Sequence, residues 1–250
     1  MCLCNFAEKG CDNPMIILYI ILVLFVLWAV LFFLVAPKEM TNILQRDPAA
    51  RNYFEVILLY PGLHAVVAHR YAHFFYKHKM FLLARIISQF TRFFTGIEIH
   101  PGAKIGRGLF IDHGMGIVIG ETAEIGDNCT LYQNVTLGGT GKDKGKRHPT
   151  IGNNVLIGSG AKVLGPFSVG DNSKIAANAV VLSEVPDNST AVGVPARVVR
   201  INNQRVSSMD LDQIHIPDPT SQEICRLNKL VHDLEEKLEH TEQNHDRKED

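Results

Sequence analysis

Cysteine is scarce in this chain, and its distribution excludes a fold built on disulfide bonds. Only five cysteines occur in 250 residues. Three lie close together near the start and two are isolated: Cys2, Cys4, Cys11, Cys129 and Cys225. Isolated thiols indicate a reducing compartment, because disulfide scaffolds need paired cysteines throughout their core. The three cysteines at the start could bind a metal ion or carry lipids. Their C-x-C-x6-C spacing matches no common zinc site, so the sequence does not decide between these roles.

An excess of charge of either sign is also missing. Lysine and arginine total 25 and aspartate and glutamate total 26, which gives a formal net charge of −1. Proteins that bind nucleic acid through their overall charge carry a basic surplus, so we expect no nucleic-acid partner. The length allows one large domain or two small ones, with ample material for a core.

Charged residues, glycine and proline are all absent from residues 15–36 (MIILYIILVLFVLWAVLFFLVA). A helix rises about 1.5 Å per residue, so this run would cross a hydrocarbon core about 30 Å thick. The segment before it lacks the basic character of a signal peptide, and Lys38, Arg46 and Arg51 follow it. We therefore predict an anchor in the inner membrane with the remainder in the cytoplasm. Two alternatives to a membrane anchor stay open: the run is a buried core helix, or translation starts at Met40.

Residues 37–95 predict a short linker followed by two or three helices. Pro37 and Pro48 punctuate the linker, and apolar residues then recur at helical spacing with breaks at 60–62 and 77–79. His69 and His73 stand four residues apart on one helix face, which is metal-ligand spacing. No carboxylate is placed to complete such a site, so we interpret both as packing or surface histidines.

The pattern changes after Gly96, where aliphatic residues recur at every sixth position. Three registers contain them: Ile99, Ile105, Ile111 and Ile117; Ile119, Ile125, Leu131 and Leu137; and Ile151, Ile157, Val163, Val169, Ile175 and Val181. A period of six matches neither an α-helix nor a flat strand. It is typical of a three-sided parallel β-helix whose aliphatic side chains point inward and stack from coil to coil. We predict four to five coils over residues 96–200.

Two breaks in this register mark candidate functional positions. One lies at residues 117–119, just after Asp112-His113. The other spans residues 138–150, is rich in glycine and basic residues, and ends near Arg147-His148, so a loop leaves the coil there. A histidine beside a carboxylate suits proton removal from a hydroxyl, and an arginine suits a substrate carboxylate. The residues alone therefore favour an acyltransferase.

The chain beyond residue 200 is polar and predicts a tail with one short helix at 224–240. Apolar residues return there at steps of three and four: Ile224, Leu227, Val231, Leu234 and Leu238. This coiled-coil seam of about two heptads is marginal alone in water, so we interpret it as a clasp between copies of a trimer. The predicted segments in chain order are 1–14, 15–36, 37–95, 96–200 and 201–250.

Four stretches closely resemble bacterial serine O-acetyltransferases of the hexapeptide-repeat acyltransferase superfamily. They are RDPAA at 46–50, GIEIHPGAKIGRGLFIDHGMGIVIGETAEIG at 96–126, TLGGTGKDKGKRHPTIG at 136–152 and AVGVPARVV at 191–199. The resemblance implies an α+β fold in which N-terminal helices precede a left-handed parallel β-helix, a handedness that the usual crossover rule would not predict. It also implies acetyl transfer from acetyl-CoA to the hydroxyl of L-serine, which gives O-acetyl-L-serine for cysteine biosynthesis.

The resemblance also implies roles for individual residues. His113 matches the general base, and Glu98 stands where some family members carry an aspartate paired with that base. The ammonium group of serine would meet two aspartates, and its carboxylate would meet the arginine and histidine of the loop. These four residues are Asp47, Asp112, Arg147 and His148.

Acetyl-CoA would lie in the groove between neighbouring β-helices of a trimer, with no metal involved. The wall residues expected there are Thr140, Gly158, Ser159 and Ala177. L-cysteine is expected to compete for the serine pocket as a feedback inhibitor, and the assembly is expected to be a homotrimer or a hexamer. Members that bind cysteine synthase insert a C-terminal isoleucine, whereas this chain ends in Lys248-Glu249-Asp250, which argues against that complex.

Three other interpretations use the same scaffold. Acetylation of a sugar or antibiotic hydroxyl shares the coils and a histidine, but the RDPAA and GKRHP elements argue against it. A γ-class carbonic anhydrase needs zinc histidines with an H-x4-H element, and His100, His113 and His148 lack that spacing. An inactive, membrane-tethered trimeric scaffold is the third.

Overall fold

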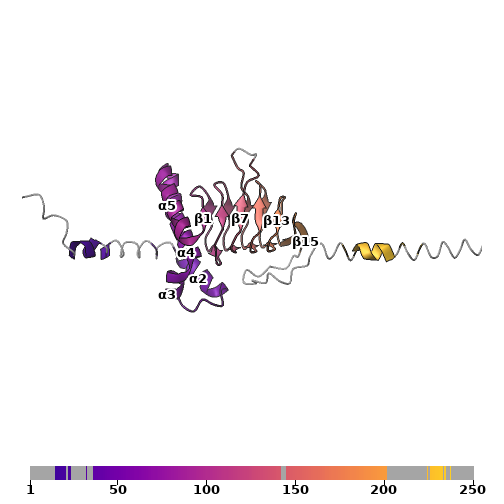
Figure 1. Ribbon diagram of the computed structural model, residues 1–250, viewed down its shortest axis with the longest axis horizontal. Coiled ribbons are helices and arrows are strands. Elements are labelled where there is room, and N and C mark those ends of the chain that lie inside the picture. Colours follow the sequence, from indigo (N-terminus) through magenta and orange to yellow (C-terminus); the bar gives the residue numbers. More distant parts are fainter. Residues whose placement is uncertain are drawn as a thin grey trace, which may run out of the picture.

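A computed structural model describes residues 15–20, 22–23, 32, 36–141, 145–201, 224, 226–232, 234 and 237. In this part of the chain a group of helices covers one end of a stack of short strands (Figure 1). The helices are α2 (Pro37–Arg46), α3 (Tyr53–Leu59), α4 (Pro61–Lys77) and α5 (Phe81–Thr95). The breaks predicted at 60–62 and 77–79 are confirmed as the boundaries of α4.

The strands form three sheets that make the faces of a triangular prism. The first face contains β1 (Glu98–Ile99), β4 (Val118–Ile119), β7 (Thr136–Gly138), β10 (Lys162–Leu164) and β13 (Val180–Val181). The second contains β2 (Lys104–Ile105), β5 (Glu124–Ile125), β8 (Thr150–Ile151) and β11 (Ser168–Val169). The third contains β3 (Phe110–Ile111), β6 (Thr130–Leu131), β9 (Leu156–Ile157), β12 (Lys174–Ile175), β14 (Ser189–Val192) and β15 (Arg197–Ile201). Among the described strands, only β15 pairs antiparallel, with β14.

The predicted six-residue register is confirmed by the pairing of the strands. On the first face Ile99 pairs with Ile119, Ile119 with Leu137, Leu137 with Val163, and Val163 with Val181. All fourteen predicted inward positions are buried except Ile105, which is partly buried. The five strands of the first face correspond to the four to five coils expected.

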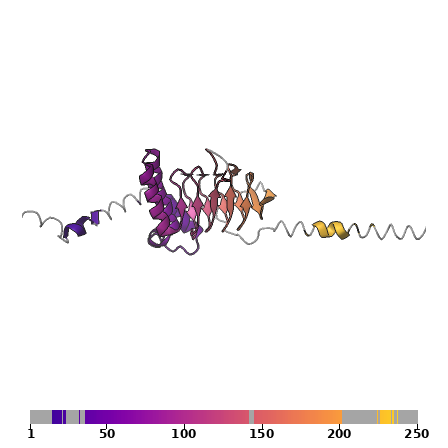
Figure 2. The same cartoon turned by 45° about the horizontal axis from the view of Figure 1, so that its top comes forward.

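The helices close the N-terminal end of the prism, where the first coil would otherwise expose its apolar interior (Figure 2). Ala65 and Val66 of α4 belong to the same buried cluster as the inward aliphatics. Close contact is possible because the second residue of α4 is a glycine: a Cβ on Gly62 would lie 2.3 Å from the carbonyl oxygen of Ile111. The side chains of α4 therefore extend the core beyond the first coil.

The predicted linker at residues 37–50 is wrong over most of its length, because Pro37–Arg46 form helix α2. Proline is compatible with the first turn of a helix, where its missing N–H has no partner to lose. Ile43 of α2 packs in a buried cluster with Phe110 of β3. Arg46 Nη1 donates to Thr130 Oγ1 of β6 at 2.8 Å, so α2 is fixed on the outer side of the third face.

His69 and His73 lie on α4 and pack against the first coil, as predicted. His69 is 3% exposed, and a ring nitrogen of His73 lies 2.8 Å from the carbonyl oxygen of Pro101. Over the described residues no group of three histidine, cysteine, aspartate or glutamate side chains is arranged to hold a metal ion.

The membrane and clasp predictions concern segments that are described only in part. Among the helices that the structure describes, none is both long and apolar enough to cross a bilayer. Much of the predicted anchor, at residues 21, 24–31 and 33–35, lies outside the described residues, as do Cys2, Cys4, Cys11 and Cys225. Residues 226–232 are helical and expose Leu227 and Val231 of the predicted seam, whereas Leu238 is outside the description.

Replacing His69 with glutamine is expected to weaken the dependence of stability on acid pH. Burial lowers the pKa of His69 to about 3, and the positive charges of His73 and Arg70 act in the same direction. The unfolded chain therefore binds more protons between about pH 6.5 and pH 3, and the free energy of unfolding falls as the pH drops through this window. This histidine contributes a slope of up to about 1.4 kcal/mol per pH unit. Urea denaturation across the window measures it, and equal slopes for both proteins would contradict the expectation.

Candidate active site

The first register break forms a bulge that lifts His113 out of the coil. Ile111 and Ile119 are eight positions apart, whereas Leu131 and Leu137 make the equivalent corner one coil later with six. His113 has φ 56°, a left-handed conformation that residues with a side chain rarely adopt. Gly114 follows with φ 75°, and a Cβ there would lie 2.5 Å from Ile97 Cδ1. The extra residues leave the His113 side chain 75% exposed.

Asp112 lies beside His113 and is mostly covered. Its side chain is 19% exposed, and its Oδ1 is 3.8 Å from His113 Nε2. Burial raises the pKa of Asp112; the imidazole of His113 opposes this rise and the negative charge of Asp47 adds to it. Asp47, at the C-terminal end of α2, is therefore close enough to Asp112 to act on its carboxylate electrostatically.

Asp47 is held in place by two hydrogen bonds. The hydroxyl of Tyr60 donates to its Oδ2 at 2.6 Å, and the backbone N–H of Ala49 donates to its Oδ1 at 2.8 Å. Burial, followed by this hydrogen bond to Asp47, raises the pKa of Tyr60, so the phenol stays a donor. In the described chain neither Asp47 nor Asp112 forms an ion pair with a lysine or arginine. Two carboxylates without a fixed cation are suited to an incoming ammonium group.

Glu98 lies on β1, at the start of the first face, one coil before the bulge. Its Oε2 pairs with Arg92 Nη1 of α5 at 3.3 Å. No hydrogen bond or ion pair joins Glu98 with His113 in the described part of the chain. The pairing of these two residues therefore stays a prediction.

Arg147 and His148 close the extruded loop, just before β8, and Thr122 holds both. The hydroxyl oxygen of Thr122 accepts the backbone N–H groups of Arg147 and His148 at 3.0 and 3.1 Å. His148 is 8% exposed, and burial lowers its pKa, followed by the charge of Arg147. The imidazole is therefore neutral near pH 7.

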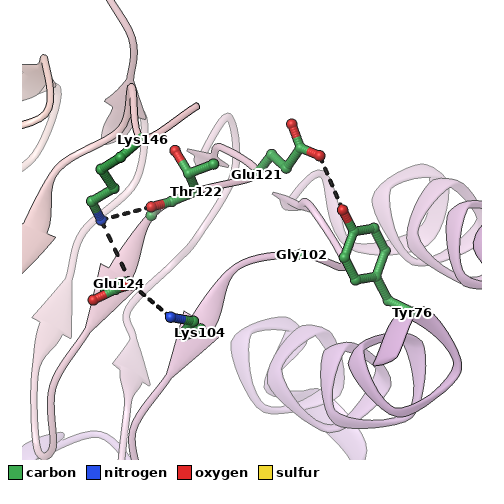
Figure 3. Close-up of a pocket in the computed structure, with 8 residues that line it drawn as sticks. Tyr76, Gly102, Lys104, Glu121, Thr122, Glu124 and Lys146 are labelled. Atoms are coloured by element: carbon green, nitrogen blue, oxygen red, sulfur yellow. Dashed lines mark hydrogen bonds and ion pairs between the residues drawn. The ribbon is translucent and has the colours of Figure 1, made fainter. Parts of the chain in front are cut away.

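Glu121 and Tyr76 orient the guanidinium of Arg147. Arg147 Nη2 donates to Glu121 Oε2 at 2.5 Å, and the Tyr76 hydroxyl of α4 donates to Glu121 Oε1 at 3.0 Å. This contact with Arg147 lowers the pKa of Glu121. Tyr76, Glu121 and Lys146 line a hollow of about 280 Å³. Figure 3 shows Tyr76 and Glu121 facing each other at one end of this hollow, with Lys146 at the other end. Within the described residues Nη1 and Nε of Arg147 have no hydrogen-bond partner, so they are available as donors for a substrate.

The four residues predicted to contact acetyl-CoA divide between two corners. Gly158 and Ser159 follow β9, and Ala177 follows β12, so these three lie at the corner between the third and first faces, as His113 does. Thr140 follows β7, at the corner between the first and second faces. Gly158 permits close stacking of coils, since a Cβ there would lie 2.6 Å from the backbone nitrogen of Ala177.

The predicted site residues thus lie along two different edges of the prism. We call residues 112–117, 132–135, 158–161 and 176–179 the base edge, and residues 120–123, 139–141 and 145–149 the loop edge. The base edge carries His113 with Asp112 and, through α2, Asp47. The loop edge carries Arg147 and His148. The first face separates the two edges within one chain.

Three contacts were not anticipated from the sequence: those of Tyr60, Glu121 and Thr122. Tyr60 lies thirteen positions from Asp47, and Thr122 lies 26 positions from His148. Such pairs meet only through the helix packing or the coil stacking, and no local spacing signals them. Glu121 and Thr122 do fall within the quoted motif at 96–126, which is the one signal that could have marked them.

Comparison with known proteins identifies the family of this chain. Residues 148–183 match the family described as bacterial transferase hexapeptide (six repeats). The serine acetyltransferase of Bacillus subtilis is 57% identical over 209 residues, which cover 84% of this chain and 96% of that protein. The serine acetyltransferase of Helicobacter pylori is 65% identical over 161 residues, which cover 64% and 94%.

Solved structures agree with these relatives. The serine acetyltransferase of Vibrio cholerae superposes with a TM-score of 0.71 at 41% identity, over 74% of this chain and 71% of that one. A Brucella abortus serine acetyltransferase in complex with coenzyme A gives 0.65 at 44% identity, over 69% and 67%. A serine acetyltransferase in complex with cysteine gives 0.70 at 40% identity, over 72% and 70%. The predicted fold of helices followed by a left-handed β-helix is confirmed, and this chain belongs to the serine acetyltransferase family.

Proposed function

We propose that this chain transfers the acetyl group of acetyl-CoA to the hydroxyl of L-serine, with His113 as the general base. The observation that carries the proposal is an exposed imidazole on a bulge beside two carboxylates, Asp47 and Asp112, that no fixed cation neutralises within the described residues. The relatives at 57% and 65% identity are serine acetyltransferases, which supports serine over a sugar or antibiotic acceptor. The product, O-acetyl-L-serine, fits the role in cysteine biosynthesis that the family implies.

The chemistry requires one proton acceptor. His113 takes the hydroxyl proton while the serine oxygen forms a bond with the thioester carbonyl carbon. The tetrahedral intermediate then breaks its carbon–sulfur bond, and the departing thiolate of coenzyme A takes the proton from the imidazolium. A neighbouring carboxylate stabilises that imidazolium, a role available to Asp112 at 3.8 Å and predicted for Glu98.

Serine would be held at both ends. Its ammonium group would bind Asp47 and Asp112, and its carboxylate would bind Arg147 and His148. L-cysteine carries the same two groups, and a family member is known in complex with it, which supports feedback inhibition at this site.

A trimer would complete the site, because the two sets of residues lie on different edges of one chain. When the base edge of one subunit faces the loop edge of the next, the contact is head to tail and closes into a threefold ring. The same contact would bring Thr140 of the loop edge to Gly158, Ser159 and Ala177 of the base edge. A coenzyme A groove between subunits follows, in keeping with the relative that binds coenzyme A.

Further assembly is a separate part of the proposal. The outer side of α5 exposes Leu82, Ile86, Phe90 and Phe93, which pairing of two trimers into a hexamer would cover.

The membrane anchor at 15–36 is supported only by its apolar composition. Flotation of the full chain and of residues 40–250 with lipid vesicles tests the anchor.

Replacing His113 with asparagine is expected to lower kcat by about 10² to 10⁴ fold, because the general base is lost. Asparagine tolerates the left-handed conformation at this position, so the bulge is kept. The rate of thiol release from acetyl-CoA with L-serine measures the effect. His78→Asn, at the end of α4, is the matched control. Full activity of His113→Asn would exclude His113 as the base, and release that needs a sugar instead of serine would overturn the substrate.

The apparent affinity for L-serine is expected to fall in acid through the titration of Asp112. The raised pKa of Asp112 means that this carboxylate loses its charge at a higher pH than an ordinary aspartate does. Asp47→Asn removes a like charge and is expected to move the acid limb of the apparent affinity for L-serine, measured as 1/KM, to lower pH, besides lowering its plateau. An acid limb that stays in place in this variant would contradict the coupling.

Mixed trimers test whether two subunits build each site. His113→Asn and Arg147→Ala are each expected to be nearly inactive alone. When they are co-expressed with different tags and purified through both, every ring contains both variants, and one site in three pairs an intact base edge with an intact loop edge. We expect a comparable fraction of wild-type kcat. Mixtures as inactive as their components would show that each site is built within one chain.

A further inference from the structure

We propose that Thr122 is a positioning residue that keeps His148 neutral with its proton on Nε2, so that this nitrogen donates a hydrogen bond to the carboxylate of the substrate. The inference rests on the proposed function and deepens it. It names a residue that touches no substrate and that sets how the loop edge recognises an amino acid.

The hydrogen bonds of Thr122 determine which ring nitrogen of His148 carries the proton. Its Oγ1 accepts the backbone N–H of Arg147 at 3.0 Å and that of His148 at 3.1 Å, which occupies both lone pairs. The hydroxyl proton is then directed at the remaining neighbour, His148 Nδ1, at 2.8 Å. The backbone N–H of Thr122 also points at Nδ1, at 3.1 Å. Two donors facing Nδ1 make it an acceptor, and the ring proton must therefore be on Nε2.

The surroundings of the ring keep it in this state. His148 is 8% exposed, and burial and the charge of Arg147 both lower its pKa, so a second proton is disfavoured. The imidazole lies directly over Gly120, where a Cβ would be 2.1 Å from Nε2. Within the described residues Nε2 has no hydrogen-bond partner, which leaves its proton for a ligand.

The backbone of Thr122 is itself fixed. Lys146 Nζ donates to the carbonyl oxygen of Thr122 at 2.7 Å (Figure 3). The preceding residue, Glu121, accepts a hydrogen bond from the guanidinium of Arg147. Thr122 therefore connects the turn between β4 and β5 with the end of the extruded loop. Its hydroxyl sets the position of the Arg147-His148 backbone, and together with the backbone N–H of Thr122 it sets the tautomer of the imidazole.

Thr122→Val tests the proposal, because valine keeps the shape and removes the hydroxyl. It leaves the two backbone N–H groups unpaired and removes one of the two donors that face Nδ1. We expect KM for L-serine to rise about tenfold, the loss of roughly one good hydrogen bond, while kcat and KM for acetyl-CoA stay within about twofold. Thr122→Ser keeps the hydroxyl and is expected to restore KM.

Ethanolamine separates positioning from a general structural effect, because it has the ammonium and hydroxyl groups of serine and no carboxylate. It is measured as an acceptor or, where its turnover is slow, by its inhibition of serine acetylation. In Thr122→Val the preference for L-serine over ethanolamine is expected to fall by the same factor by which KM rises, with ethanolamine unaffected. Thr190→Val, on β14 far from the loop edge, is the control and should change neither value.

Three outcomes would overturn the proposal: an unchanged KM in Thr122→Val, an equal loss for serine and ethanolamine, or a Thr122→Ser protein as impaired as Thr122→Val. Failure of the proposed function is a different result. It would show as wild-type protein that releases no thiol with L-serine, whatever the variants do.

Discussion

The stacking of aliphatic side chains in the prism is the constraint on which the rest of the structure depends. Each inward residue of the first face lies directly over its counterpart one coil earlier, from Ile99 to Val181. Each Å² of apolar surface buried in this register stabilises the fold by about 25 cal/mol. A one-residue slip would turn the aliphatic side chains outward. Insertions are therefore tolerated only at the corners. The bulge at His113 and the loop before Arg147 are two such insertions, and they carry the residues of the proposed active site.

A rigid prism with three edges divides the site between two of them. The base edge presents a proton acceptor and two carboxylates, and the loop edge presents donors for a carboxylate. Neither edge alone can hold an amino acid at both ends. In the proposed trimer both sets of groups would meet, because every base edge would face a loop edge of the next copy. The proposed assembly and the proposed substrate both follow from the position of these groups on two edges of the prism.

The six-residue periodicity makes the scaffold predictable from the sequence. The side-chain contacts between coils cannot be predicted from it. The six-residue spacing identified the inward positions, and its interruption near Ile117 identified the bulge. The prediction of a linker at helix α2 fails because proline, which breaks the interior of a helix, is compatible with its first turn. The bonds from Tyr60 to Asp47 and from Thr122 to His148 depend on packing between distant positions, which no local pattern encodes. Glu98 shows the converse, since the resemblance implies a partner in His113 whereas the structure pairs it with Arg92.

A crystal structure of the full chain with L-serine and coenzyme A bound tests the central claim most directly. The account predicts a threefold assembly in which the serine ammonium lies within hydrogen-bond distance of Asp47 and Asp112 of one subunit. It places the serine carboxylate on Arg147 and His148 of the adjacent subunit, with the hydroxyl at His113 and the coenzyme between the two edges. Serine bound entirely by one chain, or at a place remote from His113, would contradict it.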